Sequence, residues 1–387
     1  GGDGPRRLTS GDRDSSPRWS PDGRYVAFVR VTEKDGKPDH PQLFMLAMSG
    51  GDSFQFTSLP NGAGQPKWSP DGRSIAFVSE TNADDLAKAE GIKKPTPGEH
   101  ESDVRVITRA VYRFNGAGYL DTKHHQHIWL IDAPKTGGDK VSPRQLTSGR
   151  FDDDDFLWAT DGTKVYFTSR HVDEPYYDPP TTDIYSVGTA RGDVSKITSF
   201  DMGADALSIS PNGKQFAFVA SANRPVRSYS QPDLWVLDIA PSATPRNLTS
   251  EFDYDVGDGV GGDNAPPRAS GGNAPIWSSN GKTIVEVYSK EGKTNLARFD
   301  TATGTQTDVT TGNQAVVNFR SSPDRSKLFS TFSTPTQIGD LYSIDVIGRQ
   351  TRLTHLNDIL FSRLNLTEPE EVSYTSFDGK KIQAWIQ

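Results

Sequence analysis

The sequence predicts an all-β fold of the β-propeller type, and three observations carry this prediction. Six related turns recur along the 387 residues, three of the five steps between them measure 49, 51 and 44 residues, and β-rich segments follow each turn. The two clearest copies are Trp19-Ser20-Pro21-Asp22-Gly23 and Trp68-Ser69-Pro70-Asp71-Gly72. A repeat of about 40 to 50 residues with four strands in each unit is the pattern of propeller blades.

The turns themselves follow from backbone chemistry. Proline presets φ at the second position of a type I turn, Asp or Asn suits the third position, and glycine accepts a positive φ at the fourth. Such a turn joins two antiparallel strands in a tight hairpin. The weaker copies are Ala159-Thr160-Asp161-Gly162, Ser210-Pro211-Asn212-Gly213, Ser278-Ser279-Asn280-Gly281 and Ser322-Pro323-Asp324-Arg325.

Each unit is expected to supply four strands. In the first unit we expect them at residues 15–19, 24–30, 42–48 and 54–57. Outer strands of other units carry a recurring Leu-Thr or Ile-Thr pair, at residues 8–9, 146–147, 197–198, 248–249 and 353–354.

The chain is expected to divide into a propeller over residues 1–355 and a second region over residues 356–387. Residues 5–9 resemble an outer strand that has no inner strands before it. We therefore expect seven blades in the intact protein, of which six are complete here and the first is incomplete. The second region reads as a linker followed by two strands around Asp378-Gly379, which is the start of a new domain.

Composition excludes several classes of function. The net charge of −8 argues against a nucleic-acid partner. The sequence has no apolar run of the roughly 18 residues that a membrane span needs, so no membrane partner is expected. The chain has no cysteine, which fits a reducing compartment, and we expect a cytoplasmic location.

An insertion at about residues 80–123 lengthens the second step between turns to 90 residues. Its first part, residues 81–98, is charged and is expected to be an exposed, mobile loop. Its second part, residues 101–119, alternates β-branched and long polar residues and is expected to form an ordered hairpin.

Candidate binding residues lie in this second part. The three arginines stand four residues apart, a spacing that puts them on one side of either a strand or a helix. We expect them to contact a peptide carboxylate or carbonyl, the alternative being salt bridges between domains. The candidate set is Glu101, Arg105, Arg109, Tyr112 and Arg113.

Two polar clusters could in principle hold a metal ion. His125 and His127 would share one face of a strand, and residues 152–155 are four consecutive aspartates. No cysteine and no clear carboxylate partner accompanies the histidines, so we interpret them as polar residues flanking a strand. The aspartates are interpreted as a solvated blade edge, and like-charge repulsion could raise the pKa of one of them. Neither cluster predicts a metal site.

Four tryptophans precede the turns at equivalent places. Large apolar rings at such repeated positions are expected to pack between neighbouring blades rather than to stack on a ligand. They are Trp19, Trp68, Trp158 and Trp277.

Two segments resemble a known family. Asp378-Gly379-Lys380-Lys381-Ile382 through Trp385 resembles the entry hairpin of the α/β-hydrolase domain in prolyl-oligopeptidase-type (S9) serine peptidases. The segment from Arg105 to Tyr119 looks like the insertion of bacterial acylaminoacyl-peptidase-like members. The resemblance implies a seven-bladed propeller that caps an α/β-hydrolase domain with a Ser-Asp-His triad and screens substrates by size.

The resemblance also implies the partners. They are a short or N-acylated peptide as substrate and a C-terminal hydrolase domain of the same protein, with no cofactor and no metal; a homo-oligomer stays open. The sequence departs from the family in holding no Gly-x-Ser-x-Gly motif, so no catalytic residue is assigned here. We expect the chain by itself to lack peptidase activity.

A second interpretation belongs to another class of protein. A TolB-like propeller would bind a partner protein without catalysis, and its chain would end near Thr354. The hairpin predicted after Glu371 and the insertion both favour the peptidase. The paired-glutamate signature of dipeptidyl peptidases is not recognisable in the sequence.

Overall fold

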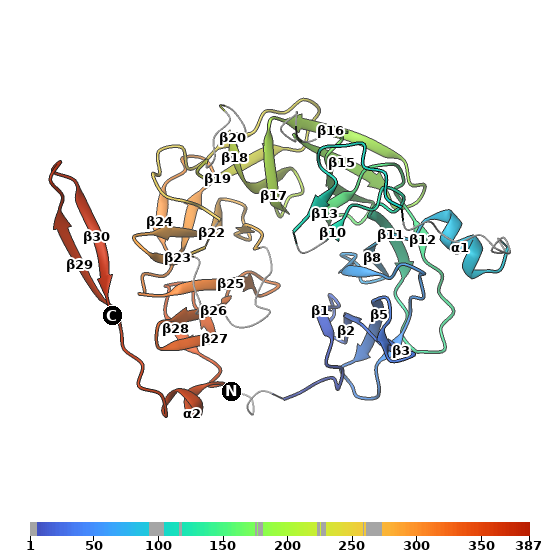
Figure 1. Ribbon diagram of the computed structural model, residues 1–387, viewed down its shortest axis with the longest axis horizontal. Helices are drawn as coiled ribbons and strands as arrows, with labels where there is room; N and C mark the ends of the chain where they lie inside the picture. Colours follow the sequence, from blue (N-terminus) through green and yellow to red (C-terminus); the bar gives the residue numbers. More distant parts are fainter. Residues whose placement is uncertain are drawn as a thin grey trace. The chain divides into compact units, whose positions relative to one another are not determined.

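The computed structural model describes residues 6–92, 104–115, 118–174, 176, 181–222, 225, 230–257, 259–260 and 273–387. Its regular structure is almost entirely β, and six antiparallel sheets of four strands follow one another along the chain (Figure 1). We call these sheets blades 1 to 6. The predicted all-β propeller fold and the six complete blades are thereby confirmed.

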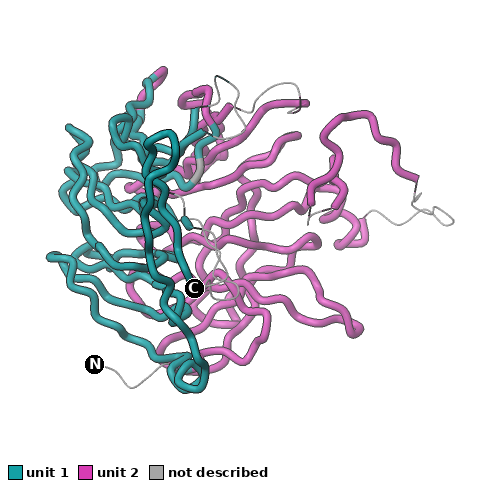
Figure 2. Tube along the Cα trace, turned by 60° about the vertical axis from the view of Figure 1, so that its left-hand side comes forward, with its two compact units in different colours: residues 1–6, 203–239, 243–387 teal, residues 7–202, 240–242 magenta. Residues whose placement is uncertain are grey.

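Two compact units divide the chain, drawn in different colours in Figure 2. The N-terminal unit comprises residues 7–202 and 240–242 and holds blades 1 to 3. The C-terminal unit comprises residues 1–6, 203–239 and 243–387 and holds blades 4 to 6, apart from the first residue of blade 4, together with a terminal hairpin. Each unit is described by itself below.

In the N-terminal unit, every blade pairs its strands antiparallel from the inner to the outer edge. The blade strands are β1 (Asp14–Trp19), β2 (Tyr25–Arg30), β5 (Gln42–Ala47) and β6 (Phe54–Gln55); β7 (Gly64–Trp68), β8 (Ser74–Ser79), β11 (His127–Asp132) and β12 (Arg144–Gln145); β13 (Asp153–Trp158), β14 (Lys164–Ser169), β15 (Thr182–Gly188) and β16 (Val194–Phe200). Outside the blades lie α1 (Ala83–Ala89) and two small hairpins, β3 (Glu33–Lys34) with β4 (Lys37–Pro38) and β9 (Arg113–Phe114) with β10 (Gly118–Tyr119).

The C-terminal unit repeats this arrangement three times. Its blade strands are β17 (Met202–Ile209), β18 (Gln215–Ala222), β19 (Asp233–Asp238) and β20 (Arg246–Asn247); β21 (Ile276–Trp277), β22 (Thr283–Lys290), β23 (Lys293–Asp300) and β24 (Gln306–Asp308); β25 (Ala315–Ser321), β26 (Leu328–Thr334), β27 (Gln337–Ile344) and β28 (Gln350–Arg352). The short helix α2 (Asp358–Phe361) and a separate hairpin of β29 (Glu370–Thr375) and β30 (Lys381–Ile386) follow.

The six turns adopt the geometry that their residues predict. In blade 1, Gly23 N donates to Ser20 O at 2.9 Å and Gly23 has φ of 70°. The Ser20 hydroxyl accepts from Tyr25 N at 3.0 Å and donates to Asp22 at 2.6 Å, which locks the turn to the next strand. The sixth turn has Arg325 at the fourth position, with φ of 58°, where the others have glycine.

The same turns also meet between neighbouring blades. A Cβ atom added to Gly72 would lie 3.4 Å from Pro21, and one added to Gly162 would lie 3.6 Å from Pro70. In each case the glycine of one turn packs against the proline of the preceding turn.

The recurring threonine, which in most blades lies two residues after the end of the outer strand, has a structural role. Its hydroxyl accepts a hydrogen bond from a backbone N–H of the third strand and donates one to the polar side chain that precedes this N–H. In blade 4, Thr249 Oγ1 accepts from Leu234 N at 3.0 Å and donates to Asp233 Oδ1 at 2.7 Å. The equivalent pairs are Thr57 with Gln42, Thr310 with Asn295 and Thr354 with Asp340. The threonine therefore fixes the short outer strand to its blade.

Apolar clusters fill the space between consecutive blades within each unit. Trp158 and Trp277 are buried there as predicted, and the Trp158 indole N–H donates to Lys67 O of the preceding blade at 2.9 Å. Trp68 is half-buried and donates to Arg18 O at 3.0 Å. The prediction is wrong for Trp19, which is 56% exposed, because no described strand precedes blade 1 to receive its ring.

Two further expectations concern the start of the chain and the membrane. Residues 6–9 form no strand, so a seventh blade stays a prediction. In the part of the chain that the structure describes, neither helix has the length and apolar character that crossing a bilayer requires.

Candidate functional site

The insertion leaves blade 2 after β8 and returns at β11. Its first part is not the loop that we expected, because residues 83–89 form the helix α1. Asn82 caps this helix: its side chain accepts from Asp85 N at 3.0 Å while the Asp85 carboxylate accepts from Asn82 N at 3.1 Å. This reciprocal capping box satisfies backbone groups at the helix start, and the pair of residues three apart was a readable signal for it.

The second part of the insertion is less regular than predicted. Residues 104–112 form no strand, and the hairpin is limited to the two-residue strands β9 and β10. The expected alternation of Val104, Val106 and Thr108 therefore does not build a long hairpin. Val104 and Val106 are exposed, at 72% and 81%, so neither has the buried face that would fix a strand register. Glu101 lies outside the described residues.

Arg105, Tyr112, Arg113 and Tyr119 gather into what we call the arginine-tyrosine cluster. The guanidinium of Arg105 lies 4.5 Å from the centre of the Tyr119 ring, and that of Arg113 lies 5.8 Å from it. The Tyr112 and Tyr119 rings are 6.1 Å apart. Cation–π contacts of this kind orient the guanidinium groups without neutralising them. The cluster is solvent-exposed, so its charges and ring faces are accessible to a ligand.

Arg109 does not join this cluster, and the prediction that all three arginines project together is wrong. Arg109 Nη2 donates to Asp173 O at 3.0 Å, in the segment after β14. The Glu174 carboxylate accepts from Ala110 N at 2.9 Å and from Val111 N at 3.4 Å. Arg109 and its neighbours therefore anchor the insertion to blade 3, which is a structural role.

The histidines that end the insertion each face an aspartate. His127 Nδ1 lies 2.9 Å from Asp153 Oδ2 in a buried pair, and His125 Nδ1 lies 3.3 Å from Asp152 Oδ1. The expectation that the histidines lack a carboxylate partner is wrong, since the partners come from the aspartate run of the next blade. Among the described residues no group of three potential ligands could hold a metal ion.

Asp154, in the aspartate run, has a perturbed pKa. Desolvation by the surrounding protein raises the pKa of Asp154, and the negative charge of Asp152 is the next largest cause. The expected like-charge effect is therefore present but second to desolvation. Asp154 also accepts from the Gln126 side chain at 3.0 Å, so the run ties blade 3 to the end of the insertion instead of forming only a solvated edge.

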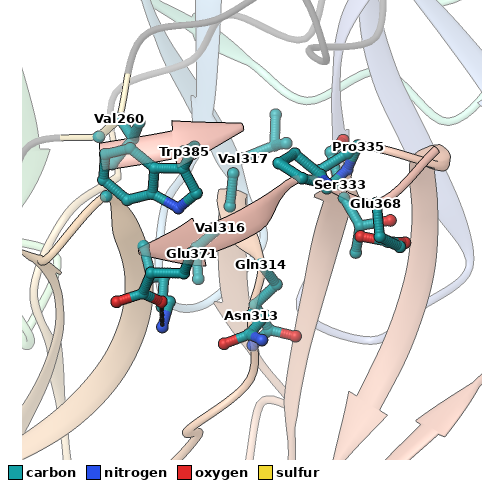
Figure 3. A pocket seen from close by; sticks show the side chains of 16 residues that line it. Val260, Asn313, Gln314, Val316, Val317, Ser333, Pro335, Glu368, Glu371 and Trp385 are labelled. Atoms are coloured by element: carbon teal, nitrogen blue, oxygen red, sulfur yellow. Dashed lines mark hydrogen bonds and ion pairs between the residues drawn. The ribbon is translucent and has the colours of Figure 1, made fainter. Parts of the chain in front are cut away.

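A pocket of about 370 Å³ lies in the C-terminal unit, between blades 5 and 6 and the terminal hairpin (Figure 3). One wall is Trp385 of β30, and Glu371 of β29 lies below it (Figure 3). The opposite walls come from residues 313–317 at the start of blade 6 and from residues 333–335. Sequence reasoning missed this pocket, because its walls are brought together only by tertiary packing.

The hairpin is held at this pocket by a small set of contacts. Lys293 Nζ lies 2.9 Å from Glu371 Oε2, and Gln383 Nε2 donates to Glu371 Oε1 at 2.7 Å. The hydrogen bond from Lys293 lowers the pKa of Glu371, with Gln383 as the next cause. Gly292, in the turn between β22 and β23, lies directly under Trp385, since an added Cβ would be 2.5 Å from the indole. The Trp385 indole therefore packs on the turn Glu291-Gly292, which we call the seat of the indole.

Comparisons with known proteins find similar peptidases. Residues 97–234 match the family model of the dipeptidyl peptidase IV (DPP IV) N-terminal region. An uncharacterized peptidase YuxL of Bacillus subtilis is 26% identical over 97% of this chain and 54% of its own length. The chain is homologous to the β-propeller portion of prolyl-oligopeptidase-type (S9) serine peptidases.

Other members of this group are also similar. Dipeptidyl-peptidase 5 of Porphyromonas gingivalis is 25% identical over 78% of the chain and 42% of its own length. The structure of acylaminoacyl peptidase from Pyrococcus horikoshii superimposes with a TM-score of 0.65 at 18% identity, over 96% of this chain and 50% of that one, and supports the fold. The chain thus spans about half the length of the peptidases it matches.

Proposed function

We propose that this chain is the substrate-gating propeller of a serine peptidase that hydrolyses short or N-acylated peptides. The observation that carries this proposal is the similarity to a peptidase over 97% of the chain. The TolB-like alternative has less support, because the peptidase similarity includes the insertion and the terminal hairpin.

The proposal includes a division of the chain near residue 355. Blade 6 is completed by β28, and β29 and β30 pair only with each other in a separate sheet. We propose that residues 356–387 are a linker and the first strands of an α/β-hydrolase domain, as the resemblance of the Asp378-Gly379 hairpin implies. The pocket beside Trp385 would then lie where the propeller meets the catalytic domain.

Within this proposal, the arginine-tyrosine cluster contacts the substrate. In the described part of the chain, neither Arg105 nor Arg113 forms an ion pair with a carboxylate. A guanidinium group that is oriented but not neutralised suits the carbonyl or carboxylate groups of a peptide. Arg109 is excluded from this role because its side chain holds the Asp173 carbonyl.

The role of the cluster can be tested in the full-length protein. Arg105→Ala and Arg113→Ala are expected to lower kcat/KM for a peptide by about tenfold for each charge-assisted hydrogen bond lost, with an unchanged melting temperature. Arg109→Ala is expected to lower the melting temperature instead. Arg13→Ala, at an exposed position of the propeller, is the matched control. Unchanged kinetics for both cluster variants would leave the cluster with a structural role only.

A second candidate activity is the release of dipeptides from a free N-terminus. The match to the dipeptidyl peptidase IV N-terminal region favours it. Chromogenic substrates with an acylated residue and with a free dipeptide separate the two activities in the full-length protein. A serine-directed inhibitor should abolish either one. The isolated chain should turn over neither substrate, and inhibitor-sensitive turnover by the chain alone would contradict the proposed division.

We also propose a cytoplasmic location, supported by a sequence without cysteine. Cell fractionation of the native host is the direct measurement. A homo-oligomer stays open, and light scattering of the full-length protein would decide it.

A further inference from the structure

A network of histidine–aspartate pairs lies where the insertion rejoins the propeller. Residues 121–127 form the returning segment, and α1 lies at the other end of the insertion. Asn82 Nδ2 donates to Lys123 O at 3.3 Å, which brings the two ends together. We call this junction the foot of the insertion.

His124 is the central residue of the foot. Its Nδ1 atom lies 2.7 Å from Asp121 Oδ2, and its Nε2 atom lies 3.3 Å from Asp85 Oδ2. A neutral imidazole has one nitrogen that is only an acceptor, and that nitrogen would face a carboxylate oxygen, which is also an acceptor. Two carboxylates on opposite nitrogens therefore favour a doubly protonated ring. His124 is 24% exposed and Asp85 is 13% exposed, so solvent only partly screens the contact.

The two carboxylates that face His124 favour the protonated ring. The hydrogen bond with Asp121 raises the pKa of His124; partial burial opposes the shift, and Asp85 on α1 supports it. In turn, although burial acts against it, the hydrogen bond from His124 lowers the pKa of Asp121. The nearest other ionisable groups along the chain are Lys123 and His125, and His125 faces Asp152 of blade 3.

Asp121 connects this junction to the arginine-tyrosine cluster. It lies two residues after Tyr119, the ring on which Arg105 and Arg113 rest. Between them, Leu120 N donates to Tyr112 O at 3.0 Å. We propose that His124 is a positioning residue that clamps the foot of the insertion through Asp85 and Asp121 and so holds the arginine-tyrosine cluster in place. Its relevance to peptide cleavage rests on the proposed function, but the clamp itself does not.

The sign of the pH dependence follows from this arrangement. Protonation stabilises the clamp, so the clamp is complete at pH values below the ordinary histidine pKa of about 6.5. It is lost as the pH rises through the higher pKa that His124 has in the folded protein. The insertion should therefore be held at mildly acidic pH and released at alkaline pH.

The test uses the chain itself and no peptide substrate. Histidine ring protons are titrated by NMR, with His124→Gln identifying the resonance. In parallel, trypsin cleavage after Arg105, Arg109 and Arg113 is measured at pH 6 and pH 8.5, each rate divided by that of a synthetic peptide of residues 104–115. The wild-type ratio is expected to rise several-fold from pH 6 to pH 8.5.

For His124→Gln, the cleavage ratio at both pH 6 and pH 8.5 should equal the higher value that wild type shows at pH 8.5. Asp121→Asn keeps the histidine and one carboxylate, and should lower the pKa of His124 and reduce the protection at pH 6. His40→Gln, an exposed histidine in blade 1, should behave as wild type. A wild-type His124 pKa at or below 6.5, or protection in His124→Gln equal to wild type at pH 6, would overturn the clamp. If the clamp stands while the arginine variants leave peptide turnover unchanged, only the proposed function fails.

Discussion

Glu286 is an ionisable residue placed where a charge is costly. It lies on β22, its side chain is fully buried, and it shares a strand face with Ile284 and Tyr288, which belong to the apolar cluster between blades 4 and 5. Its Oε1 atom accepts from Val287 N at 2.9 Å, whereas Oε2 has no hydrogen-bond partner among the described residues. Burial raises the pKa of Glu286 to about 8, against a weaker opposing effect of its own backbone contact.

This carboxyl makes the stability of the fold depend on pH. The unfolded chain loses the proton near pH 4.3, whereas the folded chain keeps it until about pH 8. The folded state thus binds more protons in this window, and the free energy of unfolding falls as the pH rises, by on the order of 5 kcal/mol. Glu286→Gln should remove this loss, so its melting temperature should exceed that of wild type at pH 8.5 and match it at pH 4.5.

Thermal melts at several pH values measure the effect. Glu251→Gln, an exposed glutamate in the same unit, should keep the wild-type slope. Parallel slopes for Glu286→Gln and wild type would show that Glu286 is ionised in the folded state.

At the residue scale, contacts between residues close in the sequence could be predicted, whereas contacts between distant residues could not. The Ser-Pro-Asp-Gly turn of blade 1 can be predicted because the hydrogen bonds that close it join residues at most five apart. The partners of His127 and His125 are not readable, because Asp153 and Asp152 lie 26 and 27 residues away on another blade. Glu286 shows the same limit, since nothing local distinguishes it from a solvated strand residue.

At the scale of single elements, the outer strands are the weakest parts of the blades. Most have only two or three residues, so their ladders supply few backbone hydrogen bonds. The outer-strand threonine adds a side-chain link from outside the ladder, as Thr249 does with Leu234 N and Asp233. The sequence pattern located this residue but did not explain it, because its partner is on the third strand.

Thr249→Val should therefore destabilise blade 4 by about 1–3 kcal/mol. Valine keeps the shape but removes the hydroxyl, which leaves a buried N–H without its acceptor and Asp233 with one bond fewer. Urea unfolding should show a lower midpoint with an unchanged slope. Thr351→Val, at an exposed position of β28, is the control and should lie within about 0.5 kcal/mol of wild type. Equal midpoints for the two variants would contradict the role given to the hydroxyl.

The insertion shows where element-level reasoning failed. The helix α1 was missed because its seven residues are too few for a clear apolar period, and none of them is buried. The prediction of a long hairpin was wrong for a different reason. Alternation of side chains predicts a strand only where one face can be buried, and Val104 and Val106 face solvent.

At the scale of the whole molecule, the terminal hairpin is attached to blade 5 as well as to its linker. The turn Glu291-Gly292 has positive φ at both residues, 50° and 73°, and Trp385 rests on its glycine. Gln383 Nε2 also reaches Glu291 O at 3.3 Å. These contacts therefore hold the hairpin in one orientation against blade 5.

Gly292→Ala should loosen the hairpin and leave the blades intact. The new methyl group would lie 2.5 Å from the Trp385 ring, so the indole must move. Amide hydrogen exchange in β29 and β30 should accelerate, while exchange in β22 and β23 changes little. Gly36→Ala is a matched control: the turn Asp35-Gly36 has φ values of 52° and 72°, and the new Cβ meets no atom within 4 Å. Equal exchange rates in β29 and β30 for the two variants would contradict the proposal that the contact between Gly292 and Trp385 holds the hairpin.

The contact between the proline of one turn and the glycine of the next has a consequence for how such a chain can grow. A Cβ on Gly281 would lie 3.8 Å from Pro211, as with the pairs in the N-terminal unit, so one four-residue motif closes its own hairpin and also carries both halves of the junction with its neighbours. A tandem duplication of the gene segment for one blade would produce a copy whose turn already fits the copy before it. The contact between the turns of an added blade and its neighbour would therefore not have to arise by separate mutations.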